Sequence, residues 1–172
     1  MRRKVTVAII IIVCYLLQCT VFQALSFASI SPNLLIVVTS AFGFMRGKKE
    51  GIWVGFFCGL CMDIFYGSTI GFYALIYMYI GFFNGMFRKL YYPEDIKLPL
   101  LLIMGSDLIY NFAVYFFMFF FRGRFQFAYY IQHIILPELV YTMLATIVLY
   151  MIILKVNQRL ELIEKRSAKK FV

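Results

Sequence analysis

Six apolar blocks, each near the length that an α-helix needs to cross a bilayer, constrain the fold of this chain more than any other feature. A transmembrane helix needs about 20 apolar residues. The blocks cover residues 5–26, 31–46, 50–66, 70–88, 97–121 and 130–154. Because the chain is 63% hydrophobic and only 15% charged, a water-soluble core of this size cannot hide so much apolar surface. The sequence therefore predicts an all-α integral membrane protein, a bundle of six transmembrane helices.

The basic residues predict how this bundle is oriented. All but two of the 17 Lys and Arg residues lie at the N-terminus, in the loops at 46–49 and 88–97, or from Lys155 onward. The two exceptions are Arg122 and Arg124. Since cytoplasmic loops carry the Lys and Arg excess, both termini are predicted to be cytoplasmic. This agrees with the even number of helices, which places both termini on the same side. The net charge of +9 thus reflects membrane topology and not nucleic acid binding.

The chain is predicted to form one six-helix membrane domain, residues 1–154, followed by a basic cytoplasmic tail, residues 155–172. Val156, Leu160 and Ile163 in the tail are at helical spacing. This spacing fits either a helix that lies on anionic headgroups or the solvated end of the sixth helix. The first apolar block is long and is followed by no clear Ala-x-Ala cleavage site, so we expect a retained helix and not a cleaved signal peptide.

The third block contains a row of glycines that ends in a carboxylate. Gly51, Gly55, Gly59 and Asp63 are four residues apart and therefore share one face of a helix. Glycine on such a face lets a second helix approach closely, and a carboxylate that faces lipid is costly. Two interpretations of Asp63 stay open: a cap or hydrogen-bond acceptor for neighbouring backbone, and a substrate or proton site. The predicted helix-packing or partner interface comprises Gly51, Gly55, Gly59, Asp63, Gly67 and Gly71.

Four further polar residues are predicted to make contacts inside the membrane. Asp107 and Asn111 are four residues apart in the fifth block, and His133 and Glu138 lie in the sixth. A lone histidine in such a place is more typical of a hydrogen-bonded packing residue than of a catalyst. An intramembrane aspartyl enzyme is an alternative that requires Asp63 and Asp107 to converge, but no Gly-x-Gly-Asp motif accompanies either residue.

We expect no cofactor and no metal. Cys58 and Cys61 form a C-x-x-C pair, but a structural zinc ion needs four ligands and a redox thiol needs exposure. Because the pair lies within an apolar helix, both cysteines are interpreted as packing residues. The sequence also contains no Gly-rich phosphate loop and no Walker motif.

Two segments carry a resemblance to a known family. Residues 32–75 begin with the motif PNLL, continue through a short helix with a basic end, and contain the glycine row with Asp63. Residues 135–138 read ILPE and open the last block. With its length and its number of apolar blocks, the chain resembles the MreD family of rod shape-determining proteins over essentially its whole sequence.

The resemblance implies a non-enzymatic scaffold subunit of the bacterial cell-elongation complex, which makes peptidoglycan and sets cell shape. The implied location is the inner (cytoplasmic) membrane, with several crossings. The implied partners are an MreC-type single-pass membrane protein, through helix–helix contacts, and, directly or indirectly, the MreB filament and the elongation polymerase/transpeptidase pair. No small-molecule substrate is expected.

The MreD family also resembles, in fold, the substrate-binding subunits of ECF transporters. An alternative function is therefore the substrate-binding membrane subunit of a vitamin-type ECF importer. The short outer loops of this chain contain few groups suited to binding a vitamin.

Overall fold

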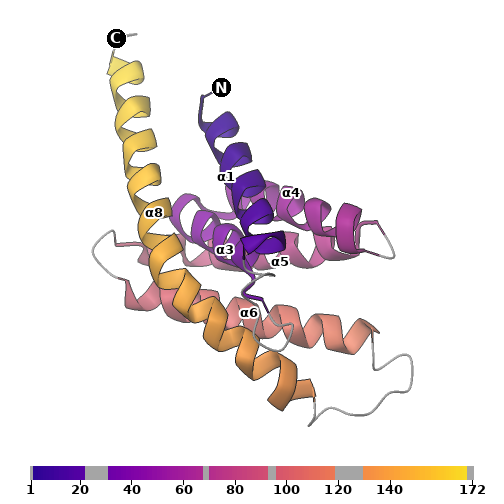
Figure 1. Ribbon diagram of the computed structural model, residues 1–172. Helices are drawn as coiled ribbons and strands as arrows, with labels where there is room; N and C mark the ends of the chain where they lie inside the picture. Colours follow the sequence, from indigo (N-terminus) through magenta and orange to yellow (C-terminus); the bar gives the residue numbers. More distant parts are fainter. Residues whose placement is uncertain (1, 22–30, 68–69, 93–95, 119–129, 170–172) are drawn as a thin grey trace.

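The computed structural model describes residues 2–21, 31–67, 70–92, 96–118 and 130–169, most of which are helical (Figure 1). In chain order the elements are α1 Arg2–Cys19, α3 Leu34–Arg46, α4 Lys48–Tyr66, α5 Phe72–Met86, the 3-10 turn η1 Phe87–Leu90, α6 Lys97–Met118, the π-helical turn η3 Ile131–Ile135 and α8 Leu136–Lys169. Within these ranges the chain forms no strand. The predicted all-α class is confirmed.

Each predicted apolar block contains a helix, but the ends of the helices differ from the blocks. α1 ends at Cys19, and residues 22–30 lie outside the described residues. α5 is shorter than its block, because a glycine in the left-handed region precedes it and a 3-10 turn follows it. α8 is longer than its block and continues as a helix to Lys169, well into the segment predicted as a tail.

α3 lies at the centre of the molecule. All of its residues from Leu34 to Met45 are buried, and it contacts α1, α4, α5, α6 and α8. Its 13 residues form a helix about 20 Å long, which is shorter than the hydrocarbon core of a bilayer at about 30 Å. A short apolar helix enclosed on all sides is typical of a core element. The other helices are therefore arranged around α3.

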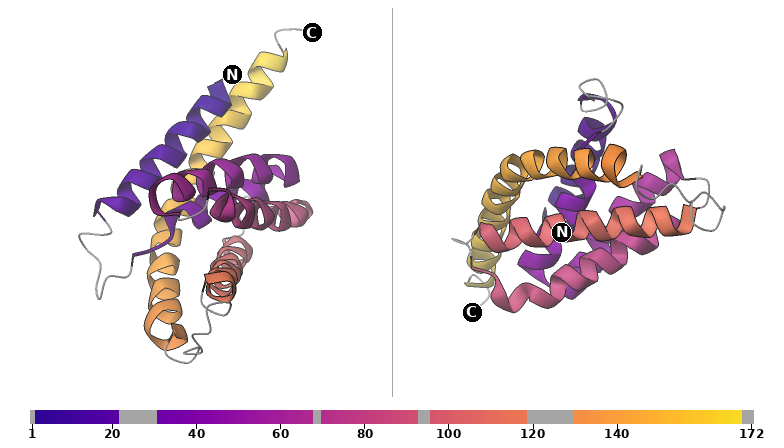
Figure 2. Two further views of the ribbon diagram at one scale, coloured as in Figure 1. Left: turned by 90° about the vertical axis from the view of Figure 1, so that its right-hand side faces the viewer. Right: turned by 90° about the horizontal axis from the view of Figure 1, so that it is seen from below.

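The arrangement brings both described ends of the chain to the same end of the molecule. In Figure 1, the axes of α3, α4, α5 and α6 lie in broadly similar orientations, whereas the axes of α1 and of the C-terminal half of α8 cross them. Figure 2 shows α1 and the C-terminal half of α8 side by side. A hydrogen bond between Arg3 and Glu164 joins these two segments.

Two helical segments among the described residues are long and apolar enough to cross a membrane. They are Lys97–Phe117 and Ile131–Glu164. The second has 34 residues and is about 51 Å long, so its last turns extend beyond an apolar layer of about 30 Å. Large apolar side chains such as Trp53 and Leu101, 63% and 66% exposed, lie on the outside of the molecule. An outer surface of this kind is typical of contact with lipid.

The start of the last helix adapts to Pro137. Proline has no N–H to donate, and its ring clashes with the carbonyl group four residues earlier. The π-helical turn Ile131–Ile135 ends two residues before this proline and changes the hydrogen-bond ladder there. Glu138 follows Pro137 directly and lies in the first turn of α8. Its carboxyl group faces Asp107 and Asn111 of α6.

Candidate functional site

Asp63 caps the N-terminus of α5. One carboxylate oxygen accepts hydrogen bonds from the N–H groups of Gly71 and Ala74, at 3.0 Å and 2.9 Å, and the other accepts from Tyr73 N–H at 2.9 Å. The first N–H groups of a helix have no acceptor within the helix, and together they carry a partial positive charge. Asp63 is only 1% exposed, so these three donors replace water around its carboxylate. The geometry is that of a backbone cap.

The glycine row on α4 is covered by α5. A Cβ atom on Gly55 would lie 2.7 Å from the carbonyl carbon of Tyr77, and one on Gly59 would lie 2.6 Å from the nitrogen of Ala74. Real Cβ atoms do not approach backbone this closely. A Cβ atom on Gly51 would likewise overlap the backbone of α5. The two helices therefore touch backbone to backbone along the row.

Gly67 and Gly71 shape the turn between these helices. Gly67 N–H donates to the carbonyl groups of Met62 and Asp63, each at 3.1 Å, and so ends α4. Gly71 has a φ of +104°, which residues with a side chain rarely adopt. This conformation directs Gly71 N–H to the Asp63 carboxylate. The turn and the cap thus depend on each other.

Asn33 connects α3, α5 and α8. Its side-chain oxygen accepts hydrogen bonds from Ile36 N–H at 3.3 Å, as an N-cap of α3, and from the Tyr77 hydroxyl at 2.8 Å. Its own N–H donates to the Thr142 hydroxyl oxygen at 3.1 Å. All of these groups are buried. Because buried polar groups without partners are costly, this network favours one arrangement of the three helices.

Asp107, Asn111 and Glu138 lie together beside the Asn33 network. Asp107 is fully buried and faces Thr142 across the contact between α6 and α8. The Asn111 amide donates to the Asp107 carbonyl oxygen at 3.1 Å and also lies against the half-buried Glu138 carboxyl. Among the described residues, neither Asp107 carboxylate oxygen has a partner that meets the geometry of a full hydrogen bond, and the Thr142 hydroxyl is a donor that faces them. The structure therefore brings three of the four predicted intramembrane polar residues together.

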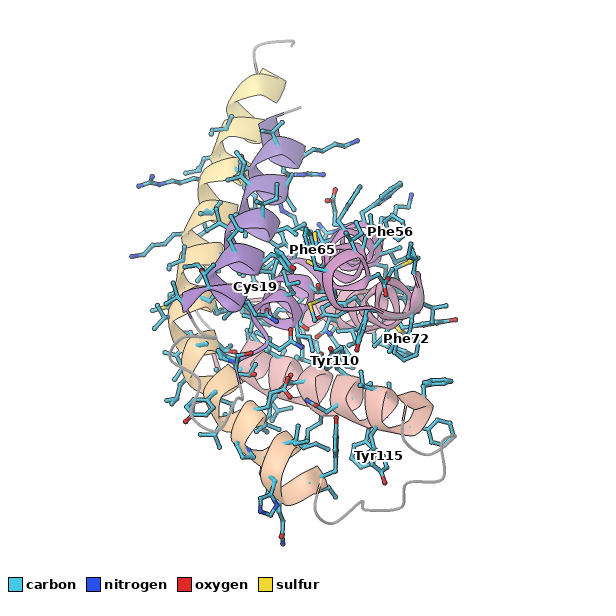
Figure 3. The ribbon with its side chains drawn as sticks, turned by 45° about the vertical axis from the view of Figure 1, so that its right-hand side comes forward. Cys19, Phe56, Phe65, Phe72, Tyr110 and Tyr115 are labelled. Atoms are coloured by element: carbon cyan, nitrogen blue, oxygen red, sulfur yellow. The ribbon has the colours of Figure 1, made fainter. Side chains whose placement is uncertain are left out.

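Tyrosine rings separate this carboxyl pair from Asp63. The Tyr110 ring lies between α6 and the α4–α5 pair, 5.4 Å from the Tyr77 ring and 6.2 Å from the Tyr73 ring, measured between centroids (Figure 3). Tyr73 also donates its N–H to Asp63. Among the described residues, Asp63 and Asp107 share no hydrogen-bond partner. The contacts of the two aspartates are therefore not those of a catalytic pair.

A polar cluster joins α1, the α3–α4 connection and α8. Arg3 pairs with Glu50 and Glu164, and Arg46 donates to Glu164 at 3.1 Å and to the Asn157 side-chain oxygen at 2.6 Å. Partial burial raises the pKa of the Glu164 carboxyl, but the hydrogen bonds and charges of Arg46 and Arg3 lower it by more, so the net pKa is below its usual value. These five residues form what we name the charged end.

Replacing Arg46 with Ala is expected to destabilise the protein by about 1–3 kcal/mol, because it removes the donor to the fully buried Asn157 side chain. Arg3→Ala is the matched control. It removes more exposed ion pairs and is expected to cost less than about 1 kcal/mol. Thermal unfolding of the detergent-solubilised chain measures both. Equal losses for the two variants would contradict the role assigned to Arg46.

Comparison with known proteins identifies the family. A family model described as rod shape-determining protein MreD matches residues 1–160. The chain belongs to the MreD family. No curated protein and no solved structure matches it. Members of the MreD family take part in rod shape determination as bacterial inner-membrane proteins, and MreD is not a known enzyme family.

Two glycines that help to form the site in this member of the MreD family were not predicted. Cβ atoms on Gly81 and Gly85 of α5 would overlap the backbones of Gly51 and Lys48, so α5 has a glycine row of its own. The G-x-x-x-G spacing of residues 81–85 was a usable signal. His133, which was predicted to make intramembrane contacts, is exposed in η3.

Proposed function

We propose that this member of the MreD family is a non-enzymatic scaffold subunit of the cell-elongation (peptidoglycan synthesis) complex in the bacterial inner membrane. It contributes to cell shape through helix–helix contacts with an MreC-type single-pass protein. Directly or through that protein, it associates with the MreB filament and with the elongation polymerase/transpeptidase pair. One observation supports this proposal best. Asp63 and the glycine row make contacts between α4 and α5, so these residues serve to hold the bundle together, as in a structural protein.

The proposal includes six membrane helices with both termini in the cytoplasm, in a bundle related to the substrate-binding subunits of ECF transporters. The charged end supports this orientation, because Arg3, Arg46 and the last turns of α8 gather on one side. The turn at Gly71, which connects α4 to α5, is at the opposite end of α4 from Arg46. Basic residues favour the cytoplasmic side of the membrane. Of the six proposed membrane helices, α3 is the short one enclosed by the others.

The glycine row is not available to a partner helix while α5 covers it. We therefore assign Gly51, Gly55 and Gly59 to packing of the bundle and place the partner helix on one of the exposed apolar faces. Such faces are extensive on α1, α4 and α8. Helices associate in lipid through close packing and occasional polar contacts, so a scaffold needs no open polar pocket.

Affinity capture of the tagged full-length chain from its native membrane, followed by mass spectrometry, tests this function. We expect recovery of an MreC-type protein together with the elongation polymerase and transpeptidase. Membranes that carry the untagged chain provide the background. Recovery of a transporter ATPase pair in place of these proteins would overturn the scaffold and favour the importer alternative.

A further inference from the structure

Basic residues from two separate segments lie at the turn between α3 and α4. Lys48 and Lys49 begin α4, and Arg88 belongs to η1. The Arg88 side chain lies across Gly47, because a Cβ atom on that glycine would be 2.9 Å from the Cδ atom and 3.4 Å from the Nη1 atom of Arg88. Gly47 has a φ of +98°, in the region that glycine favours, and its missing side chain leaves this space to Arg88. We name Lys48, Lys49 and Arg88 the basic cluster.

The basic cluster has no acidic partner among the described residues. The ion pairs in this part of the chain are those of the charged end, and none of them includes a member of the cluster. Glu50 follows Lys49 in the sequence, but its carboxylate pairs with Arg3 of α1. All three members of the cluster are exposed. The cluster therefore presents uncompensated positive charge at the surface, which attracts an anion.

An exposed aromatic strip runs along α4 from the basic cluster. Lys49, Trp53 and Phe57 are four positions apart and are all exposed, so they share the outer face of the helix. The rings of Trp53 and Phe57 stack with their centroids 6.1 Å apart. The Lys48 ammonium lies 5.3 Å from the centre of the Phe82 ring on α5. Cations at one end of an apolar strip fit an amphiphile that has an anionic headgroup and an acyl chain.

We propose that this surface binds an anionic phospholipid, with its phosphate at the basic cluster and an acyl chain along Trp53 and Phe57. The lysine ammonium groups and the Arg88 guanidinium provide charge-assisted hydrogen bonds to phosphate oxygens. A free phosphate ion would use only the cluster, whereas a lipid also covers the aromatic strip. The binding does not depend on the proposed scaffold function. Its assignment to the cytoplasmic leaflet rests on the proposed orientation of the helices.

Fluorescence of Trp53 tests the site, because it is the single tryptophan of the chain. The full-length chain is reconstituted into phosphatidylcholine vesicles that contain a fixed fraction of either phosphatidylglycerol or phosphatidylcholine with brominated acyl chains. Bromine quenches a tryptophan that it contacts. We expect phosphatidylglycerol to quench Trp53 with a relative binding constant about five-fold higher than that of phosphatidylcholine. Both leaflets contain the brominated lipid, so the result does not depend on the orientation of the chain.

Two double variants distinguish the basic cluster from a general attraction by net charge. Lys49→Gln together with Arg88→Gln is expected to reduce the preference for phosphatidylglycerol to less than about two-fold. Lys155→Gln together with Arg159→Gln removes the same charge from exposed positions on α8 and is expected to retain the preference. Because all four side chains are exposed, both variants are expected to fold, which circular dichroism verifies.

Three outcomes would overturn the proposal. Equal quenching by the two brominated lipids would show that Trp53 contacts bulk lipid only. An equal loss of preference in the two double variants would show that net charge, and not the cluster, attracts the lipid. Loss of the preference on addition of inorganic phosphate at constant ionic strength would make the cluster a site for free phosphate. Affinity capture with the Lys49 and Arg88 double variant is expected to recover the same partners, so failure of the lipid site and failure of the scaffold are separate results.

Discussion

Asp63→Ala is expected to lower the free energy of unfolding by about 3–5 kcal/mol. The substitution leaves the N–H groups of Gly71, Tyr73 and Ala74 without their acceptor in a buried place. Each buried donor without a partner costs about 1–3 kcal/mol, and loss of the charge at the start of α5 adds to this. Titration of the purified chain from mild detergent into sodium dodecyl sulfate, followed by circular dichroism, measures the loss.

The Asp63→Asn variant distinguishes two roles of Asp63, a cap of α5 and a contact with a partner protein. The amide keeps one oxygen acceptor, so we expect roughly half of the loss seen with alanine. Affinity capture of the folded Asn variant should recover the same partners as the unsubstituted chain, because the Asp63 carboxylate faces α5. Loss of partners from a variant that unfolds normally would show that Asp63 belongs to a partner interface and not to the cap.

Gly81→Leu is expected to destabilise the protein by about 3 kcal/mol or more and to abolish its support of rod shape. A Cβ atom at this position would overlap the backbone of Gly51, which cannot move without separating α4 from α5. Overpacking of well-packed interiors usually costs about 1–3 kcal/mol, and here the obstacle is backbone on both sides. Accumulation of the protein in membranes, its unfolding in detergent and the shape of complemented cells all measure the effect.

Gly105→Ala is the matched control on α6. Nothing lies within 4 Å of a Cβ atom at this position, so the methyl group enters open space. Alanine favours a helix over glycine by up to about 1 kcal/mol, and the variant is expected to be as stable as the unsubstituted chain or slightly more stable. If Gly81→Leu and Gly105→Ala behave alike, α4 and α5 do not make the close contact described here.

The sequence predicted the site on α4 because helical spacing is a local property. Successive members of the row from Gly51 to Asp63 are four positions apart, and this spacing alone places them on one face. What covers that face is not local. The row is covered by backbone at Gly81 and Ala74 of the next helix. Predicting these contacts would have required the register in which the two antiparallel helices pack.

The contacts that join distant parts of the chain had no signal in the sequence. Asn33 and Thr142 are 109 positions apart, and although Asn33 belongs to the PNLL motif, nothing in the sequence pairs it with Thr142. The helical spacing of Val156, Leu160 and Ile163 predicted that the tail continues the last helix, as α8 does. What this segment contacts was not predicted, because Arg46 and Arg3, which pair with Asn157 and Glu164, lie 111 and 161 positions away from them.

The contact between α4 and α5 has a consequence for biogenesis. Its contacts join residues close in sequence, within the span from Lys48 to Met86, so its contact order is low. A helical hairpin of this kind can close as soon as its second helix has left the ribosome. The Asn33 network cannot form until Thr142 has been synthesised. The chain thus has an order of assembly in which the hairpin forms first and the last helix closes the core.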